Sequence, residues 1–249
     1  MNLGDANIIV TGAGAGFGKA MSLYFSSKGA NVFAVDINND SLKALKNQDS
    51  EIQIYSCDIV NNEKVELIVD EIFSMNKGVN VLINNAGIMK NAPLFNLLQR
   101  PDSRHSIDLW NQVIGVNQNA VFYMSRSVVN KMMRNRNKGV IVNVSSIAAR
   151  GNAGQTAYVA SKAAVEAMSK VWAKELGVFG IRSVTVSPGF INTIGAHDAL
   201  EEKMLAKWVE KTPLKRTGEV SEIVSAIDFI IQNEFFNGET INVNGGLVL

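Results

Sequence analysis

Short apolar segments alternate with longer segments of helical periodicity along this 249-residue chain. The apolar segments are bounded by Gly, Asn or Asp and are typical of fully buried strands. We expect strands at residues 7–11, 31–35, 52–57, 80–83, 140–144, 183–187 and 240–243. We expect helices at residues 18–28, 41–46, 62–75, 108–137, 157–178, 200–210 and 220–232. This alternation predicts an α/β fold, with a doubly wound, seven-stranded parallel sheet that has helices on both faces.

The composition is typical of one globular domain. Hydrophobic residues make up 47% and charged residues 19% of the chain, with only 4 prolines. Because no Pro- or Ser-rich linker interrupts the pattern, we expect residues 1–249 to form a single domain. One cysteine, Cys57, and two histidines exclude a disulfide framework and leave too few ligands for a cysteine- or histidine-based metal centre.

Charge and hydropathy narrow the class of partner. The formal net charge is +1, which gives no bulk attraction to nucleic acid or to an acidic membrane, so we expect neither partner. A basic cluster at residues 131–138 fits a solvated helix C-terminus. No apolar stretch approaches the roughly 20 residues needed to span a bilayer. The N-terminus lacks the basic region and long apolar stretch of an export signal, so we expect a cytoplasmic location.

A glycine-rich segment, residues 11–18, lies between the first predicted strand and the first predicted helix. Its glycines allow positive φ angles and close approach of the backbone to a ligand. The N-terminus of the following helix offers N–H groups and positive potential to a pyrophosphate. The segment therefore predicts a dinucleotide site, with a tight structural turn as the alternative.

Acidic and amide residues follow the next strands. Asp36 ends the second predicted strand, where its carboxylate can accept hydrogen bonds from ribose hydroxyls and would repel a 2′-phosphate. Neither Ala15 nor Ile37 supplies a cation for such a phosphate, so NAD(H) is expected over NADP(H). A turn or capping role for Asp36 is the alternative. Asp58 is placed to meet the adenine edge, and the small residues at 84–87 would let the backbone pass close to the cofactor.

Catalytic chemistry is indicated by Tyr158 and Lys162, four residues apart on one helix face. A nearby ammonium lowers the pKa of a phenol, so we expect Lys162 to prepare Tyr158 for proton transfer at a substrate oxygen. Ser146 ends a buried strand, and its hydroxyl can polarise a carbonyl there. Ser145 remains a rival for that role. Chance co-occurrence on an amphipathic helix is the alternative for the Tyr–Lys pair.

In the order of these motifs the whole chain resembles the short-chain dehydrogenase/reductase family, in its compact branch of about 250 residues. The resemblance rests on a Thr-Gly-x-x-x-Gly-x-Gly pattern, an Asn-Asn-Ala-Gly pattern, a central-helix Asn, the Ser and the Tyr-x-x-x-Lys pair, and a Pro-Gly-x-Ile-x-Thr pattern. These fall on Thr11, Gly12, Gly16 and Gly18; on 84–87; on Asn117; on Ser146, Tyr158 and Lys162; and on 188–193. It implies a single-domain Rossmann fold.

The resemblance also implies roles for these residues. Tyr158 would act as general acid/base in hydride transfer between a nicotinamide and a carbonyl or alcohol carbon. Ser146 would hold the substrate oxygen, Lys162 would bind the nicotinamide ribose, and Asn117 would support a water chain that resupplies the proton. The implied cofactor contacts come from Gly12, Ala15, Gly16, Phe17, Gly18, Asp36, Ile37, Asp58, Ile59, Asn85, Ala86, Gly87, Tyr158, Lys162, Pro188, Gly189, Ile191 and Thr193.

Two enzymatic hypotheses and one binding hypothesis follow. The first is an NAD(H)-linked enzyme acting on a small secondary alcohol or ketone. The second is a 3-oxoacyl-[acyl-carrier-protein] reductase, similar in its C-terminal half; Asp36 and Phe179, where those enzymes often place a basic residue, count against it. The third is a dinucleotide-sensing protein without catalysis, against which the intact catalytic set argues.

The sequence also gives expectations for substrate specificity and assembly. A substrate lid is expected at residues 193–211. In it, Met204, Leu205 and Trp208 either line the site or pack, and His197 is expected to be exposed. The segment 92–106, with two prolines, is expected at the substrate side or at an interface. The family resemblance implies a homotetramer.

Overall fold

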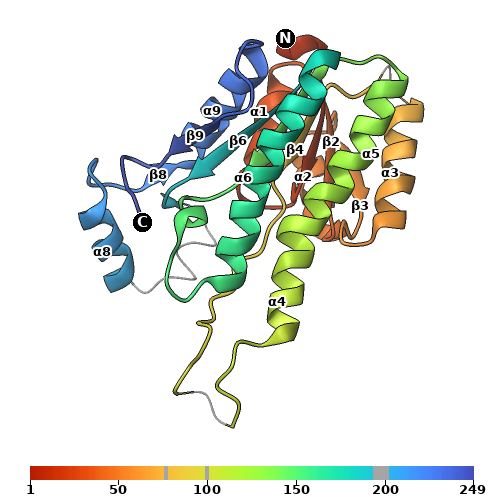
Figure 1. Cartoon of the computed structure of the whole chain (residues 1–249). Helices are drawn as coiled ribbons and strands as arrows, with labels where there is room; N and C mark the ends of the chain where they lie inside the picture. Colours follow the sequence, from red (N-terminus) through yellow and green to blue (C-terminus); the bar gives the residue numbers. More distant parts are fainter. Residues whose placement is uncertain (76–77, 99–100, 193–201) are drawn as a thin grey trace.

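The computed structural model describes residues 1–75, 78–98, 101–192 and 202–249. A seven-stranded parallel sheet runs through it in the order β3-β2-β1-β4-β5-β6-β9 (Figure 1). Its strands are β1 (Asn7–Thr11), β2 (Asn31–Asp36), β3 (Gln53–Ser56), β4 (Val81–Asn84), β5 (Gly139–Val144), β6 (Ile181–Pro188) and β9 (Thr240–Val243). The predicted doubly wound α/β fold is confirmed.

Helices cover both faces of the sheet (Figure 1). One face carries α1 (Gly16–Ser27), α2 (Asn39–Gln48) and α9 (Val220–Gln232). The other carries α3 (Asn62–Met75), α5 (Ala120–Arg134) and α6 (Thr156–Leu176). The winding changes direction between β1 and β4, and ligands of open α/β sheets bind at the carboxyl ends of the strands at such a point.

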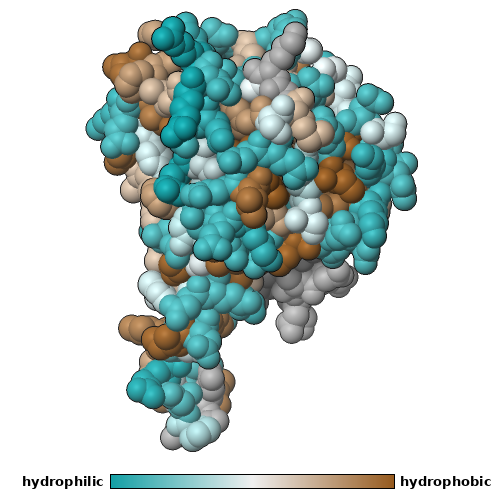
Figure 2. Space-filling view, turned by 90° about the vertical axis from the view of Figure 1, so that its right-hand side faces the viewer, coloured by the Kyte–Doolittle hydropathy of each residue, from teal (hydrophilic) through white to brown (hydrophobic). Residues whose placement is uncertain are grey.

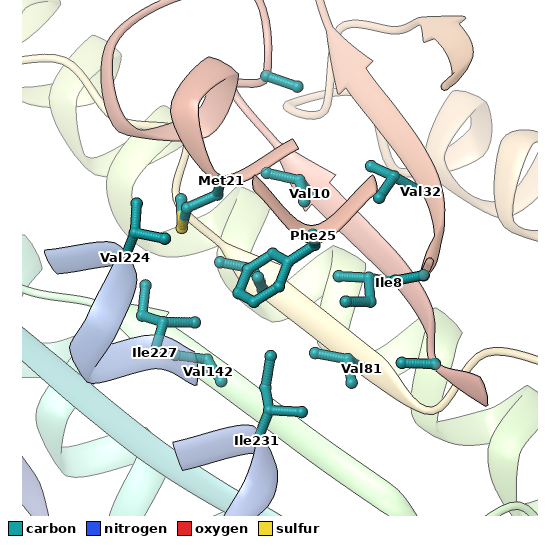
Figure 3. Packing of buried hydrophobic residues seen from close by; sticks show 14 of the residues in the cluster. Ile8, Val10, Met21, Phe25, Val32, Val81, Val142, Val224, Ile227 and Ile231 are labelled. Atoms are coloured by element: carbon teal, nitrogen blue, oxygen red, sulfur yellow. The ribbon is translucent and has the colours of Figure 1, made fainter. Parts of the chain in front are cut away.

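Apolar side chains of the sheet and of the helices pack together on the first face. Phe25 of α1 lies fully buried between the sheet and α9, with Met21 beside it (Figure 3). Val10 of β1 and Val142 of β5 pack from the sheet, and Ile227 packs from α9. This core fixes the start of α1 relative to the strand ends, where the glycine-rich segment lies.

The predicted long helix at 108–137 differs from the structure in one respect. Helical backbone runs from α4 (Ile107–Ile114) into α5, but the turn Gly115–Asn119 is π-helical. A π turn holds one more residue than an α turn and is frequent at functional sites. Asn117, buried in this turn, is one of the predicted site residues. The sequence pattern could not reveal the wider turn, because the helical periodicity of apolar residues continues before and after it.

A second small sheet joins β7 (Ile191–Asn192) to β8 (Gly218–Glu219) and was not expected from the sequence. Each strand has two residues, too few to show any alternation. Helix α8 (Glu202–Lys211) lies between these strands in the chain. The small sheet therefore brings the segments before and after α8 side by side.

The segment between β4 and α4 forms an arm that projects from the body (Figures 1 and 2). Within residues 92–106, the His105 amide donates to the Leu94 carbonyl over 2.9 Å, and Phe95 bridges to Arg104. Residues 94–95 and 104–105 therefore pair antiparallel, as in a hairpin. Leu94 is 73% exposed, and the apolar residues Phe95, Leu97 and Leu98 of the arm are exposed as well. In the described residues no helix is both long and apolar enough to cross a membrane.

Candidate active site at the carboxyl ends of the strands

The glycine-rich segment is tied to the end of β4 by the side chain of Thr11. Its hydroxyl oxygen accepts hydrogen bonds from the backbone amides of Asn85 (3.0 Å) and Ala86 (3.1 Å). The side-chain amide of Asn85 donates in return to the Thr11 carbonyl over 2.9 Å. The two predicted cofactor-binding loops therefore form one unit. Thr11, the first residue of the Thr-Gly-x-x-x-Gly-x-Gly pattern, therefore belongs to this unit through its side chain.

Glycine is required at two places in this unit. Gly12 has φ +66°, and a Cβ there would lie 2.8 Å from the Cα of Ala86. At Gly18 a Cβ would overlap the carbonyl oxygen of Gly12. By contrast, nothing lies within 4 Å of a Cβ built on Gly16, which also has positive φ, at +53°. The backbone is crowded on its inner side and open at Gly16.

Helix α1 begins at this open position. Ala15 is its N-cap and provides no side-chain hydrogen bond to the first turn. The first N–H groups of a helix need an acceptor, and their positive potential favours an anion. The open position at Gly16 and the uncapped helix start therefore fit a dinucleotide pyrophosphate.

Asp36, the last residue of β2, contacts the glycine-rich segment of the predicted dinucleotide site. One carboxylate oxygen accepts from the Gly14 amide and the other from the Asn38 amide, both over 2.9 Å. An ionised carboxylate accepts about four hydrogen bonds, so each oxygen retains a lone pair for a ribose hydroxyl. The turn role and the ribose role of Asp36 are therefore compatible. Ile37, next in the chain, is 69% exposed.

The next predicted cofactor residues lie after β3 and β4. Asp58 is half-buried and accepts a hydrogen bond from the Val60 amide, which shapes the turn before α3. Ile59 packs against the core of the second face. A Cβ on Gly87 would lie 3.4 Å from the Nζ atom of Lys162, so this glycine lets the backbone pass beside the lysine.

Ser146 and Tyr158 come together at the end of β5 and the start of α6. Burial raises the pKa of the Tyr158 phenol, and a side-chain hydrogen bond with Ser146 lowers it in part. Ser145 is fully engaged elsewhere, since its hydroxyl lies 2.9 Å from a carboxylate oxygen of Glu166 and 3.2 Å from the Lys162 carbonyl. Of the two serines, Ser146 is therefore the one beside the tyrosine.

Lys162 is 4% exposed, and its ammonium donates to the Val144 carbonyl over 2.8 Å. The Nζ atom lies 5.9 Å from the centre of the Tyr158 ring. Burial lowers the pKa of Lys162 to about 8.

The expectation that Lys162 lowers the pKa of Tyr158 is wrong for this structure. The pKa of the phenol is raised, mainly because burial penalises the phenolate. The spacing of four residues does place the two side chains on one helix face. Burial, which spacing does not reveal, decides the direction of the pKa shift.

Asn117 faces the same region from the π-helical turn. Its side-chain amide donates to the Ile88 carbonyl over 2.9 Å, and its side-chain oxygen accepts from the Ile88 amide over 2.8 Å. The same amide nitrogen lies 3.3 Å from the hydroxyl of Ser161, on α6 between Tyr158 and Lys162. Asn117 therefore joins the loop after β4 to the helix that carries the Tyr–Lys pair.

The predicted nicotinamide side of the site follows β6. Gly189 donates to the Val243 carbonyl over 2.9 Å, and Ile191 is buried in the small sheet. Pro188 is the last residue of β6. Thr193 lies outside the described residues, as do His197 and the side chains of Met204 and Leu205. Trp208 of α8 is half-buried and stacks on Phe190 with ring centres 4.8 Å apart.

Among the parts of the chain that the structure describes, no three His, Cys, Asp or Glu side chains are grouped so as to hold a metal ion. Gln155, about one helical turn before Tyr158, contacts Asn91 of the loop after β4, which the motifs did not indicate.

The chain is similar to known proteins along its whole length. A family profile described as enoyl-(acyl carrier protein) reductase matches residues 12–248. The chain is 36% identical to the 3-oxoacyl-[acyl-carrier-protein] reductase of Thermotoga maritima, with all of both chains covered. It is 33% identical to the reductase of the same name from Vibrio cholerae, again over both full chains. It is also 32% identical to the sorbitol-6-phosphate 2-dehydrogenase of Klebsiella pneumoniae, covering 99% of this chain and 97% of the relative.

Proposed function

This chain belongs to the short-chain dehydrogenase/reductase family of nicotinamide-dependent oxidoreductases, and from that premise we propose that it reduces the ketone of 3-oxoacyl thioesters with NADH. The observation that carries the proposal is the meeting of Ser146, Tyr158 and Lys162 beside the loop after β4, which Asn85 ties to the glycine-rich segment. Relatives named 3-oxoacyl-[acyl-carrier-protein] reductase cover the whole chain and support this substrate class over a simple alcohol or ketone.

The proposed reaction adds a hydride and a proton to a ketone. A nicotinamide bound at this edge would supply the hydride. Tyr158 holds a proton at its phenol oxygen, because burial raises its pKa and keeps the phenol neutral. The Ser146 hydroxyl, beside that phenol, is placed to donate to the substrate oxygen and orient it. Lys162 is positioned to bind a ribose hydroxyl, while its contact with Val144 fixes its ammonium.

The coenzyme is proposed from Asp36. A negative charge held by two backbone amides beside the glycine-rich loop suits the ribose hydroxyls of NAD(H) and repels the extra phosphate of NADP(H). No side chain at position 37 opposes that repulsion, because residue 37 is Ile.

A second candidate function is the oxidation or reduction of a small alcohol or ketone that no carrier protein presents. Phe179, 52% exposed, stands where carrier-dependent relatives often place a basic residue, and this favours the second candidate. So does the similarity to a sorbitol-6-phosphate dehydrogenase. Both candidates use the same catalytic residues.

The test follows the absorbance of the reduced coenzyme, with NADH and NADPH assayed in parallel. Substrates are acetoacetyl groups on coenzyme A and on acyl-carrier protein, beside a panel of free ketones and alcohols. We expect NADH-dependent turnover of the thioesters and loss of turnover in Tyr158→Phe. Turnover of free ketones alone would transfer the assignment to the second candidate. Coenzyme binding without turnover of any substrate would support the non-catalytic sensor instead.

Assembly into a homotetramer is also proposed, from the family resemblance. Light scattering of the purified protein at several concentrations tests it. A mass near the 27.0 kDa of one chain at all concentrations would contradict it.

A further inference from the structure

The loop after β4, residues 88–92, is held from two sides. On the inner side, Asn117 makes its two hydrogen bonds to the backbone of Ile88. On the outer side, Ala92 forms a parallel bridge with Gln155. Between these points Met89 is 52% exposed. The loop is therefore fixed at both ends, and it presents an apolar side chain between them.

The side chain of Gln155 contacts three residues on two segments. Its amide nitrogen donates to the side-chain oxygen of Asn91 over 2.9 Å and lies 3.5 Å from the sulfur of Met89. Its amide oxygen accepts from the side chain of Asn152 over 2.9 Å. Donor and acceptor are both used, so the orientation of this amide is defined. It joins the loop after β4 to the turn that leads into α6.

Gln155 also lies at the start of the helix that carries the catalytic tyrosine. It is the N-cap of α6 and makes no side-chain capping bond there, so its amide is committed to the loops. The Gln155 carbonyl accepts the Val159 amide over 2.8 Å, and Tyr158 lies within the same turn. This backbone bond does not depend on the side chain at position 155, so the start of the helix that carries Tyr158 is held separately from the loop at residues 89–92.

We propose that Gln155 is a positioning residue that holds Met89 and its loop as the wall of the substrate site and so sets which carbon chains the enzyme accepts. The proposal rests on the proposed function, because the wall matters only if a ketone binds beside Tyr158. Met89, an unbranched and adaptable side chain, suits an unbranched aliphatic chain attached to the reacting ketone.

The first test compares Gln155→Leu, which keeps the size and removes the amide, with the wild type on 3-oxoacyl thioesters of increasing length. Loss of these hydrogen bonds is expected to raise KM for the thioester about fivefold. We expect kcat and the KM for NADH to stay within about twofold, because Gln155 does not contact the reacting atoms or the coenzyme loops. The preference among chain lengths is expected to flatten. Thr156→Ala, at the exposed neighbouring position, is the matched control.

A double-variant cycle tests the route of the effect. Asn91→Ala is expected to reproduce the rise in KM, and the double variant with Gln155→Leu to be no worse than either single variant. Additive losses would overturn the proposal, because they mean that the two side chains act separately. An unchanged KM and chain-length profile in Gln155→Leu would overturn it as well, as would a loss confined to kcat.

Hydrogen exchange separates failure of this proposal from failure of the proposed function. Gln155→Leu is expected to speed exchange of the backbone amides at residues 89–92 and leave the amides of the β5 core unchanged. If the wild type turns over no thioester or ketone, faster exchange would still support the clamp while the substrate assignment falls. Unchanged exchange at 89–92 would overturn the clamp whatever the substrate is.

Discussion

The carboxylate of Asp36 accepts a hydrogen bond from the Gly14 amide over 2.9 Å and so joins the end of β2 to the glycine-rich loop. The residue proposed to select the coenzyme therefore also shapes the loop that would hold it. A substitution at position 36 should change coenzyme preference and loop geometry together.

The Asp36 substitution gives the first prediction. The wild type is expected to show at least about tenfold higher kcat/KM with NADH than with NADPH. Asp36→Asn, which keeps an acceptor for the Gly14 amide and removes the charge, should narrow that ratio mainly by improving use of NADPH. Steady-state kinetics with both coenzymes measure it. Equal use of both coenzymes by the wild type would contradict the assignment.

Tyr158→Phe is expected to lower kcat by a factor of about 100 to 10,000, because it removes the proton donor at the substrate oxygen. NADH binding, followed by fluorescence, should remain within about twofold, and the melting temperature should hardly change. The combination matters, since a fall in kcat together with lost coenzyme binding would indicate a structural role for the phenol.

Lys162 gives a prediction about stability and pH. Burial lowers its pKa to about 8, whereas a lysine in the unfolded chain has a pKa of about 10.4. The unfolded state therefore binds more protons between these two pH values, so the free energy of unfolding of the wild type should rise with pH across that window. Below pH 8 the buried charge costs roughly 3 kcal/mol in full.

Lys162→Met would remove that cost and leave the Val144 carbonyl without its donor, which costs about 1–2 kcal/mol. We expect the variant to be inactive and more stable than the wild type by about 1–2 kcal/mol at pH 7. Urea unfolding at pH 7 and pH 10 measures the difference. It should shrink or reverse at the higher pH, and a constant difference would show that the lysine is not buried as a charge.

Trp208 is expected to anchor α8 through its stack on Phe190. Trp208→Ala should raise KM for the substrate about three- to tenfold, the range that corresponds to one aromatic pair. Trp208→Phe should restore most of that loss because it keeps a ring in the stack. The KM for NADH is the internal control, and an equal rise there would mean that α8 supports the coenzyme site instead.

The order of strands and helices could be predicted because each buried strand is a continuous apolar run and each helix carries an apolar stripe. A glycine-rich turn with positive φ between the first strand and the first helix could also be predicted, because it depends on residue type and on neighbours in sequence. The crowding of Gly12 against Ala86, more than 70 positions away, could not.

Other features depend on contacts between distant segments and could not be predicted. The choice of Ser146 over Ser145 rests on which hydroxyl meets Tyr158 and which meets Glu166. The direction of the pKa shift of Tyr158 rests on burial, which spacing does not report. The role of Gln155 could not be read from the sequence, because its partners Asn91 and Met89 lie more than 60 positions away.

The π-helical turn Gly115–Asn119 holds one residue more than an α turn. Deleting one residue there would let regular winding continue, so Met124 and Val128 would still face the sheet. The deletion would instead displace Asn117, whose side chain holds the backbone of Ile88. Insertions and deletions should therefore accumulate in the projecting hairpin ahead of α4 and avoid this turn.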